Sequence, residues 1–487
     1  MLAIPPDPAT DPANGRKIRR RDRSLRVRAG RGGGARKKGA ERMKRLQEEE
    51  VPLRMIVAIL LIAIPLSGCN SWFGKEDAPL PGERRPVMLN PSEIEIDPEL
   101  QGTAIVLPPP VNNPDWPQAD GYANHAMHHL QIAELPQLEW RAGIGSGIRS
   151  GRPRLPPPVI GTGKVFAMDS RSQVSAFDAN SGELIWRTDI APAEERHHTA
   201  GGIAYENGRV FATTGFAQVV ALDAQTGEET WRSRVDSPVH APPTVRDGRV
   251  FTVSLNNTLY ALDAGDGREL WTYKGIPEIA AVVGGASPAV DGDVIVAPFS
   301  SGELVALRVE NGRVLWADSL ASLRKTDELG SISHIRASPV IDRGRVYALS
   351  YGGMMVAVDL RNGRRLWDAS IGGLERPWVA GDTVYVVTVE RDLIALDRDS
   401  GRIYWATRLP TYKNEEKRKG PVFWSGPVLV SDRLVVTGSN GEVLAVSPYT
   451  GELLGKIGMP SDVLVPPVVA GGTLYFLNKN ADLSAYR

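Results

Sequence analysis

The sequence contains a single cysteine, Cys69, so no disulfide can form within the chain. It also lacks an apolar run of the roughly 20 residues that a membrane-spanning helix needs. The apolar run from Met55 to Leu66 has only 12 residues. Lys and Arg together number 57, as do Asp and Glu, so the whole chain carries no excess charge.

The neutral total conceals a strong asymmetry along the chain. Residues 1–50 carry 15 Lys and Arg against 7 Asp and Glu, and Arg54 adds one more base. From Cys69 onward 41 basic residues face 50 acidic ones, a net charge of −9. Nucleic acid is therefore excluded as a partner of this part, because binding it needs a basic surface. Residues 1–42 have two interpretations. They are a nucleic-acid-binding arm or, as we favour, they come from an over-extended reading frame, and translation truly starts at Met43 or Met55.

The segment before Cys69 is typical of a secretory signal peptide. Arg54 precedes the short apolar run, and Ser67 and Gly68 follow it. Residues 66–69 resemble the bacterial lipobox, which implies cleavage before Cys69 and attachment of acyl chains to its thiol. In the sorting pattern of such lipoproteins, Asn70 implies transfer to the outer membrane. The alternative is that Cys69 is an ordinary buried residue. Residues 1–68 are thus predicted to be a disordered basic extension followed by a signal peptide.

Residues 69–136 are rich in proline and keep no helical or strand period. We predict a tether that lets the following domain stand away from a membrane. His125, His128 and His129 lie close together near its end. They are candidates for a metal site or, as we favour, for packing contacts, because no cysteine or carboxylate completes a familiar ligand pattern.

An eleven-residue pattern recurs through the rest of the chain, with Ala first, Gly seventh and Trp eleventh. Residues 221–231 show it clearly, and the other copies are residues 176–186, 261–271, 306–316, 357–367, 395–405 and 445–455. The last copy keeps Ala445 and Gly451 but has Gly455 in place of Trp. Repetition at about 40–50 residues indicates a propeller or a solenoid.

Each repeat contains four short β-rich runs separated by glycine turns, which predicts an antiparallel four-stranded blade. Residues 137–141, around Trp140, have the character of a fourth strand without the first three. Residues 468–486 supply three strands without a fourth. Pairing these segments closes the ring. We therefore predict an all-β, eight-bladed β-propeller over residues 137–487.

The repeated residues have structural roles at every position. Alanine allows close approach of strands, Asp accepts hydrogen bonds at the turn, Gly supplies positive φ, and Trp fills the space between blades. A catalytic role for the repeated aspartates is disfavoured, because one active site does not need several copies. Function is expected where the copies differ, in the connections after Trp271 and Trp316.

The repeat resembles the pyrroloquinoline-quinone-type propeller repeat. Together with the lipobox, residues 138–487 resemble the lipoprotein family that scaffolds the outer-membrane β-barrel assembly machine. This resemblance implies a monomeric, non-catalytic scaffold without cofactor or metal, facing the periplasm, that binds the periplasmic domains of BamA, the central barrel subunit. It places the contact in residues 274–288 and 331–339. The implied partner-binding residues are Ile276, Ile279, Val282, Val283, Gly284, His334 and Arg336.

The local match to the family is not complete, since Val283, His334 and Arg336 stand where the family pattern has an arginine and acidic residues. Independently of the resemblance, the connection after Trp271 is unusually apolar. An exposed apolar loop favours a partner, and the alternative is that its side chains cover the central channel.

Two other functions fit the repeat. A quinoprotein dehydrogenase shares the fold, but that class needs calcium ligands and commonly has a vicinal disulfide. A chain with one cysteine cannot form that disulfide, so this function is disfavoured. A polysaccharide-binding propeller would expose aromatic side chains, for which Trp378 and Trp424 are the candidates. The charged residues 412–420 are interpreted as a solvated loop or as a secondary contact.

Overall fold

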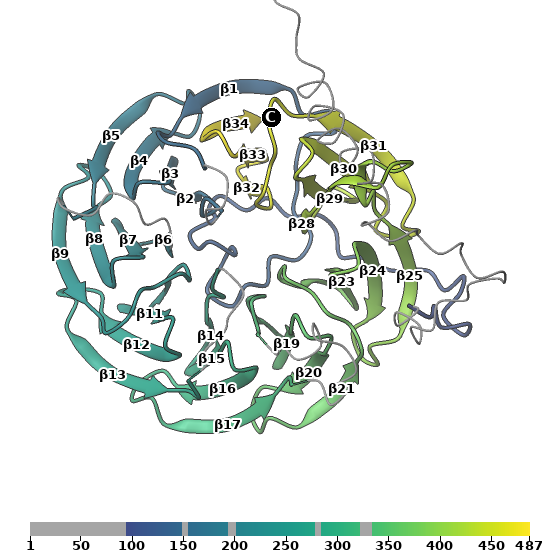
Figure 1. Ribbon diagram of the computed structural model, residues 1–487, viewed down its shortest axis with the longest axis horizontal. Coiled ribbons are helices and arrows are strands. Elements are labelled where there is room, and N and C mark those ends of the chain that lie inside the picture. The colour runs from purple at the N-terminus through teal and green to yellow at the C-terminus, as the bar shows by residue number, and fades with distance from the viewer. Residues whose placement is uncertain (1–93, 149–153, 193–200, 278–283, 322–333) are drawn as a thin grey trace, which may run out of the picture. The chain divides into compact units, whose positions relative to one another are not determined.

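The computed structural model describes residues 94–148, 154–192, 201–277, 284–321 and 334–487. These residues form eight four-stranded antiparallel sheets arranged as blades around a central axis, which confirms the predicted all-β propeller (Figure 1). No helix in these ranges is long and apolar enough to cross a membrane. The predicted extension, signal peptide and Cys69 lie outside the described residues.

Within each blade the strands follow chain order from the axis outward, except in the blade that closes the ring. The first blade consists of β2(Val159–Gly161), β3(Lys164–Met168), β4(Gln173–Asp178) and β5(Leu184–Asp189), and the second of β6(Gly201–Glu206), β7(Arg209–Thr214), β8(Gln218–Asp223) and β9(Glu229–Arg234). The third blade consists of β10(Thr244–Arg246), β11(Arg249–Val253), β12(Thr258–Asp263) and β13(Glu269–Lys274), and the fourth of β14(Ala289–Asp291), β15(Val294–Pro298), β16(Glu303–Arg308) and β17(Val314–Ser319). The next three are β18(Val340–Asp342), β19(Arg345–Leu349), β20(Met355–Asp359) and β21(Arg365–Ala369); β22(Trp378–Ala380), β23(Thr383–Val387), β24(Asp392–Asp397) and β25(Ile403–Arg408); β28(Trp424–Val430), β29(Arg433–Gly438), β30(Glu442–Val446) and β31(Leu453–Gly458). A small hairpin, β26(Tyr412–Asn414) and β27(Lys419–Pro421), lies between the sixth and seventh blades.

The eighth blade combines both ends of the propeller sequence. Its inner strands are β32(Val468–Ala470), β33(Thr473–Leu477) and β34(Asp482–Tyr486), and its outer strand is β1(Leu138–Gly143). β1 pairs antiparallel with β34, with Trp140 opposite Ala485. The predicted ring closure is therefore confirmed, and it joins strands that lie more than 300 residues apart in the chain.

The repeated pattern links each blade to the next. The indole of Trp231 in the second blade donates to the carbonyl of Ala264 in the third, at 3.0 Å. The same ring covers Gly267, where an added Cβ would lie 2.5 Å from it. Gly267 also has φ of +76°, so a side chain there would be excluded both by conformation and by the indole. Seven blade interfaces have this tryptophan–carbonyl bond, donated by Trp140, Trp186, Trp231, Trp271, Trp316, Trp367 and Trp405.

The interface between the seventh and eighth blades is the exception, and the ring closure explains why. A repeat tryptophan packs on the turn between the third and fourth strands of the following blade. In the eighth blade these strands, β34 and β1, come from opposite ends of the chain and share no turn. A tryptophan at Gly455 would have nothing to pack on, and an added Cβ there meets no atom within 4 Å.

Residues 105–132, here called the strap, differ from the predicted tether because they pack on the propeller. Trp116 is 1% exposed and stacks on Trp378 with ring centroids 6.4 Å apart. The strap makes hydrogen bonds to the innermost strand of all eight blades, namely to Ile160, Tyr205, Val245, Val290, Ile341, Trp378, Leu429 and Val469. Because it meets each strand at only one or two residues, it has no period that the sequence could reveal.

Two of the three histidines of the strap, His125 and His129, are buried and make packing contacts, while the side chain of His128 is 42% exposed. His125 Nδ1 lies 2.7 Å from the carbonyl of Pro339, and its burial lowers the pKa of this histidine. His129 Nδ1 lies 2.7 Å from the carbonyl of Pro108, while its Nε2 accepts from the backbone N–H of Asp432. Together these bonds tie the strap to the fifth and seventh blades.

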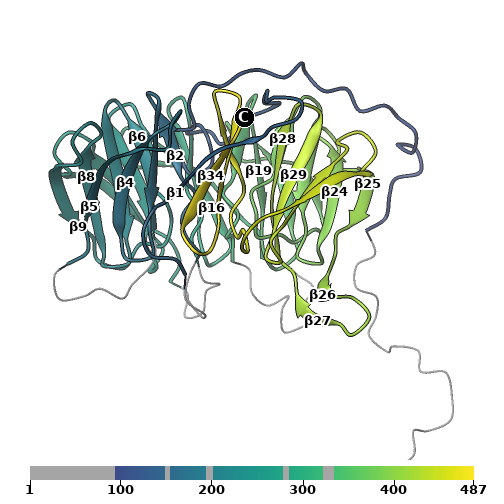
Figure 2. The ribbon, with the colours of Figure 1, turned by 90° about the horizontal axis from the view of Figure 1, so that it is seen from above.

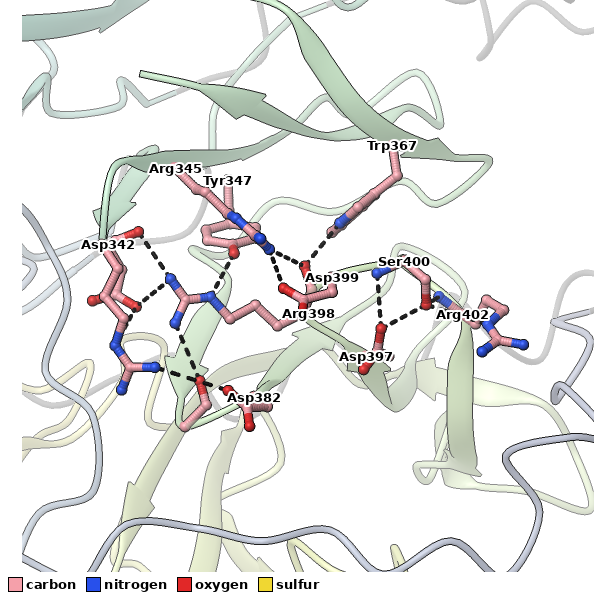
Figure 3. Close-up of polar contacts among 12 residues, drawn as sticks. Asp342, Arg345, Tyr347, Trp367, Asp382, Asp397, Arg398, Asp399, Ser400 and Arg402 are labelled. Atoms are coloured by element: carbon pink, nitrogen blue, oxygen red, sulfur yellow. Dashed lines mark hydrogen bonds and ion pairs between the residues drawn. The ribbon is translucent and has the colours of Figure 1, made fainter. Parts of the chain in front are cut away.

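A buried ion pair marks the interface between the fifth and sixth blades (Figure 3). Arg398 occupies a turn position that other blades fill with residues such as Ala224 or Leu360. Its guanidinium lies 2.9 Å from Asp342 Oδ2 and donates to the hydroxyl of Tyr347 at 2.9 Å. The side chains of Arg398 and Asp342 are 4% and 6% exposed, so the two charges depend on each other.

Candidate partner-binding face

The topology places all connections between successive blades on one face of the ring. In a four-stranded antiparallel blade, the first strand begins at the end where the fourth strand finishes. We call this side the connection face. Figure 2 shows the strap crossing one face of the ring, while the β26–β27 hairpin projects from the other. The connection face is thus the side that the strap leaves uncovered.

A cavity of about 400 Å³ lies on the ring axis, between the strap and the connection face. Its inner end is formed by Ala119 and Asp120 of the strap. Every blade contributes residues near the start of its innermost strand, including Leu155, Pro242, Gly285 and Pro466. The described walls are therefore mostly small or apolar, with a few charged groups among them.

One carboxylate and two guanidinium groups meet in this cavity. Arg154 Nη1 lies 2.6 Å from Glu375 Oε1, and Arg336 Nη1 lies 3.9 Å from the same oxygen. Arg336 Nη1 also donates to the carbonyl of Leu374 at 3.1 Å. Burial, assisted by the charge of Arg154, lowers the pKa of Arg336 to about 10. Arg336 still carries its charge at neutral pH, buried beside Glu375.

A third guanidinium group joins the cavity wall to the strap. Arg376 donates to the carbonyls of Asp120 and His125, both at 2.8 Å, and its Nε lies 3.5 Å from Asp120 Oδ1. The guanidinium also lies 5.8 Å from the ring centroid of Trp116 in the strap. Cation–π and ionic contacts together therefore hold the strap across the axis.

Gly284 and Arg336 come from different connections and lie in direct contact. Gly284 has φ of +114°, and an added Cβ would lie 2.8 Å from Arg336 Nε. Glycine is needed here because the guanidinium occupies the space of a side chain. The structure thus brings together two of the predicted partner-binding residues.

His334 is also at this position but is only 4% exposed. It therefore supports the wall of the face rather than presenting its ring to a partner. Burial, assisted by the charge of Arg336, lowers the pKa of His334 from 6.5 to about 4.

This shift predicts an acid-dependent loss of stability. The unfolded chain binds a proton at His334 below pH 6.5, whereas the folded protein resists it until about pH 4. The free energy of unfolding should therefore fall as the pH drops through this window, by up to about 3 kcal/mol from this group. Chemical denaturation measures the free energy of unfolding at pH 7.5 and at pH 5. The difference between these two values should be smaller for His334→Gln than for the unmodified protein. Gln131→Ala, at an exposed side chain without an ionisable group, is the control and should leave the difference unchanged.

Ile276 lies on the connection after β13 and is 59% exposed. Its backbone is held on both sides: its N–H donates to Glu303 Oε2 at 2.7 Å, and its carbonyl accepts from Asn257 Nδ2 at 2.7 Å. A fixed backbone with an exposed apolar side chain fits a partner contact. The other predicted residues, Ile279, Val282 and Val283, lie outside the described residues.

The sequence interpretation missed Arg154, Glu375 and Arg376. The available signal was the position of Glu375 and Arg376, just before the innermost strand β22. Glu375 and Arg376 line the axial cavity, as does Ser338 at the equivalent position before β18, so a charged pair there stands out from the repeat.

Trp378 and Trp424, the candidates for sugar stacking, are 1% and 3% exposed. Trp378 donates to the carbonyl of His128, and Trp424 donates to the carbonyl of Pro410. Both therefore serve as packing residues, and the observation that favoured a polysaccharide-binding propeller is removed. Within the described ranges, no three His, Cys, Asp or Glu side chains converge as metal ligands.

Comparison with known proteins identifies the family. The outer membrane protein assembly factor BamB of Alkalilimnicola ehrlichii is 40% identical over 349 residues, which cover 72% of this chain and 87% of that protein. The chain belongs to the BamB family. A family model described as outer membrane protein assembly factor BamB matches residues 170–407. BamB of Escherichia coli is 28% identical over 351 residues, covering 71% of this chain and 87% of that protein.

Solved structures show the same fold. BamB from Moraxella catarrhalis superposes with a TM-score of 0.62 at 18% identity, covering 72% of this chain and all of that one. A europium-containing methanol dehydrogenase superposes with a TM-score of 0.60 at 15% identity, covering 75% of this chain and 88% of that one. The same propeller fold is thus found in an assembly factor and in an enzyme, so the fold alone does not decide the function.

Proposed function

We propose that this member of an outer-membrane assembly family is a non-catalytic scaffold lipoprotein that binds the periplasmic domains of BamA through its connection face. The observation that carries this proposal is the fixed, exposed Ile276 on the face that the strap leaves uncovered. The two described acidic side chains of the axial cavity, Glu375 and Asp120, are each engaged by arginines. This arrangement favours a structural over a catalytic use of the cavity.

The anchor is part of the same proposal. Ile94, the first described residue, packs in the cluster formed by the fifth and sixth blades. Only 24 residues separate it from Cys69. Acyl chains on Cys69 would therefore anchor the propeller to the periplasmic side of the outer membrane. Cys69→Ala should abolish labelling of the protein with radioactive palmitate in cells, and labelling of this variant would contradict lipidation at Cys69.

The partner contact predicts the effect of a charge at Ile276. Ile276→Asp should weaken binding to the isolated periplasmic domains of BamA at least tenfold, because a carboxylate would be buried in an apolar contact. Affinity can be measured by isothermal titration calorimetry. The matched control is Ile185→Asp in the outer strand β5, where the isoleucine is 43% exposed but lies far from the connection face. Equal affinities for the two variants would contradict the proposed face.

A further inference from the structure

We propose that the β26–β27 hairpin is a second, electrostatic contact for the partner of the connection face, and that it binds an acidic surface of that partner. This inference rests on the proposed function. A single contact at Ile276 leaves a partner free to rotate about that point. A second contact on another connection of the same face fixes its orientation.

The hairpin has a conformation of its own. Glu415 Oε1 accepts from the backbone N–H groups of Thr411 and Tyr412, at 2.6 and 2.9 Å. The N–H of Lys417 donates to Asn414 Oδ1 at 2.8 Å, and β26 pairs with β27 through Asn414 and Lys419. The turn is therefore closed by its own side chains, so binding would not have to order it.

The base of the hairpin is fastened to the propeller. Val422 is fully buried, and its N–H donates to the carbonyl of Thr411 at 2.8 Å. Arg391 lies 5.3 Å from the ring centroid of Phe423, and Lys413 Nζ lies 3.8 Å from Asp462 Oδ1. These contacts hold the projecting strands at a fixed position beside the axial cavity, which Phe423 also lines.

The tip of the hairpin is basic. Lys417, Arg418 and Lys419 are consecutive and exposed, and Glu416 is the single acidic residue beside them that is not used to close the turn. Among the described residues, no carboxylate forms an ion pair with any of the three bases. A basic projection is unusual on a propeller chain that is acidic from Cys69 onward, and it fits an acidic partner.

The position of the tip favours the protein partner over a lipid surface. The hairpin belongs to the connection between the sixth and seventh blades and projects from the connection face (Figure 2). Ile276 belongs to the connection between the third and fourth blades of the same face. A partner seated over the axial cavity would thus meet apolar Ile276 on one side and the basic tip on the other.

The test compares two double charge reversals that change the net charge equally. Lys417→Glu with Arg418→Glu alters the tip, and Arg361→Glu with Arg364→Glu alters an exposed turn between β20 and β21. At 50 mM salt the tip variant should bind the periplasmic domains of BamA about tenfold more weakly than the turn variant. The difference should shrink at 500 mM salt, because salt screens exposed charges.

A photo-crosslinking residue at position 418, compared with one at position 276, separates the two proposals. Crosslinks to BamA from both positions, at different BamA segments, are expected. A crosslink from position 276 alone, with equal affinities for the two double variants, would overturn the hairpin contact and leave the proposed function standing. No crosslink from either position would overturn both. Binding of the hairpin to vesicles containing phosphatidylglycerol, lost in the tip variant while its affinity for BamA is unchanged, would assign the tip to the membrane instead.

Discussion

Replacing Arg398 with alanine is expected to lower the free energy of unfolding by about 3–5 kcal/mol. The guanidinium is 4% exposed, lies 2.9 Å from Asp342 Oδ2, and donates to the hydroxyl of Tyr347 and to a backbone carbonyl. Its removal leaves Asp342 charged and buried with much of its compensation lost. The effect should be visible as a lower midpoint of chemical denaturation with a similar slope.

Two variants make this expectation specific to the buried pair. Arg402→Ala removes an arginine four residues away that pairs with Asp97 and Glu99 on the surface, so it should lower the denaturation midpoint far less than Arg398→Ala does. The double variant Arg398→Met with Asp342→Leu removes both charges and should recover a large part of the lost stability. A double variant as unstable as Arg398→Ala would show that packing, rather than an unpaired charge, causes the loss.

Trp231→Ala is expected to destabilise the protein by about 3–5 kcal/mol, because it opens a cavity between two blades and removes a hydrogen bond. Trp231 is 9% exposed, donates to Ala264 at 3.0 Å and covers Gly267. Thermal denaturation followed by tryptophan fluorescence and by circular dichroism would measure the loss.

The opposite substitution at the exceptional blade interface should have little effect. Gly455→Trp restores the repeat pattern, but the eighth blade offers no turn between its third and fourth strands for the indole to cover. We expect a change of less than about 1 kcal/mol. A stabilisation comparable to the loss in Trp231→Ala would contradict the explanation that ring closure made this tryptophan dispensable.

The blades could be predicted because their determinants are local. Within about 45 residues, each repeat contains its strands, its glycine turns and the tryptophan that reaches the next blade. The role of Trp140 could be predicted for the same reason, since a fourth strand without its blade must pair elsewhere. The explanation for Gly455 needed the structure, because the missing turn exists only after the ring has closed.

The strap could not be predicted from local pattern. Asn113 donates to the carbonyl of Val469, 356 residues further along the chain. Trp116 is buried against Trp378, which belongs to the sixth blade. Single bridges to eight different strands leave no periodicity, and the prolines suggested an extended chain without indicating where it lies. The same limit applied to Arg154 and Glu375, whose pairing depends on the convergence of all blades at the axis.

The sequence by itself determined the blade, the number of blades and the way in which the ring closes, because a repeated local pattern states the same structural unit many times. Only the tertiary structure decided which face of the ring is free, since the strap covers the other one. It also decided that Gly284 and Arg336 touch while His334 is buried. These properties arise from contacts between segments that are distant in the chain, and such contacts are fixed by the geometry of the closed ring.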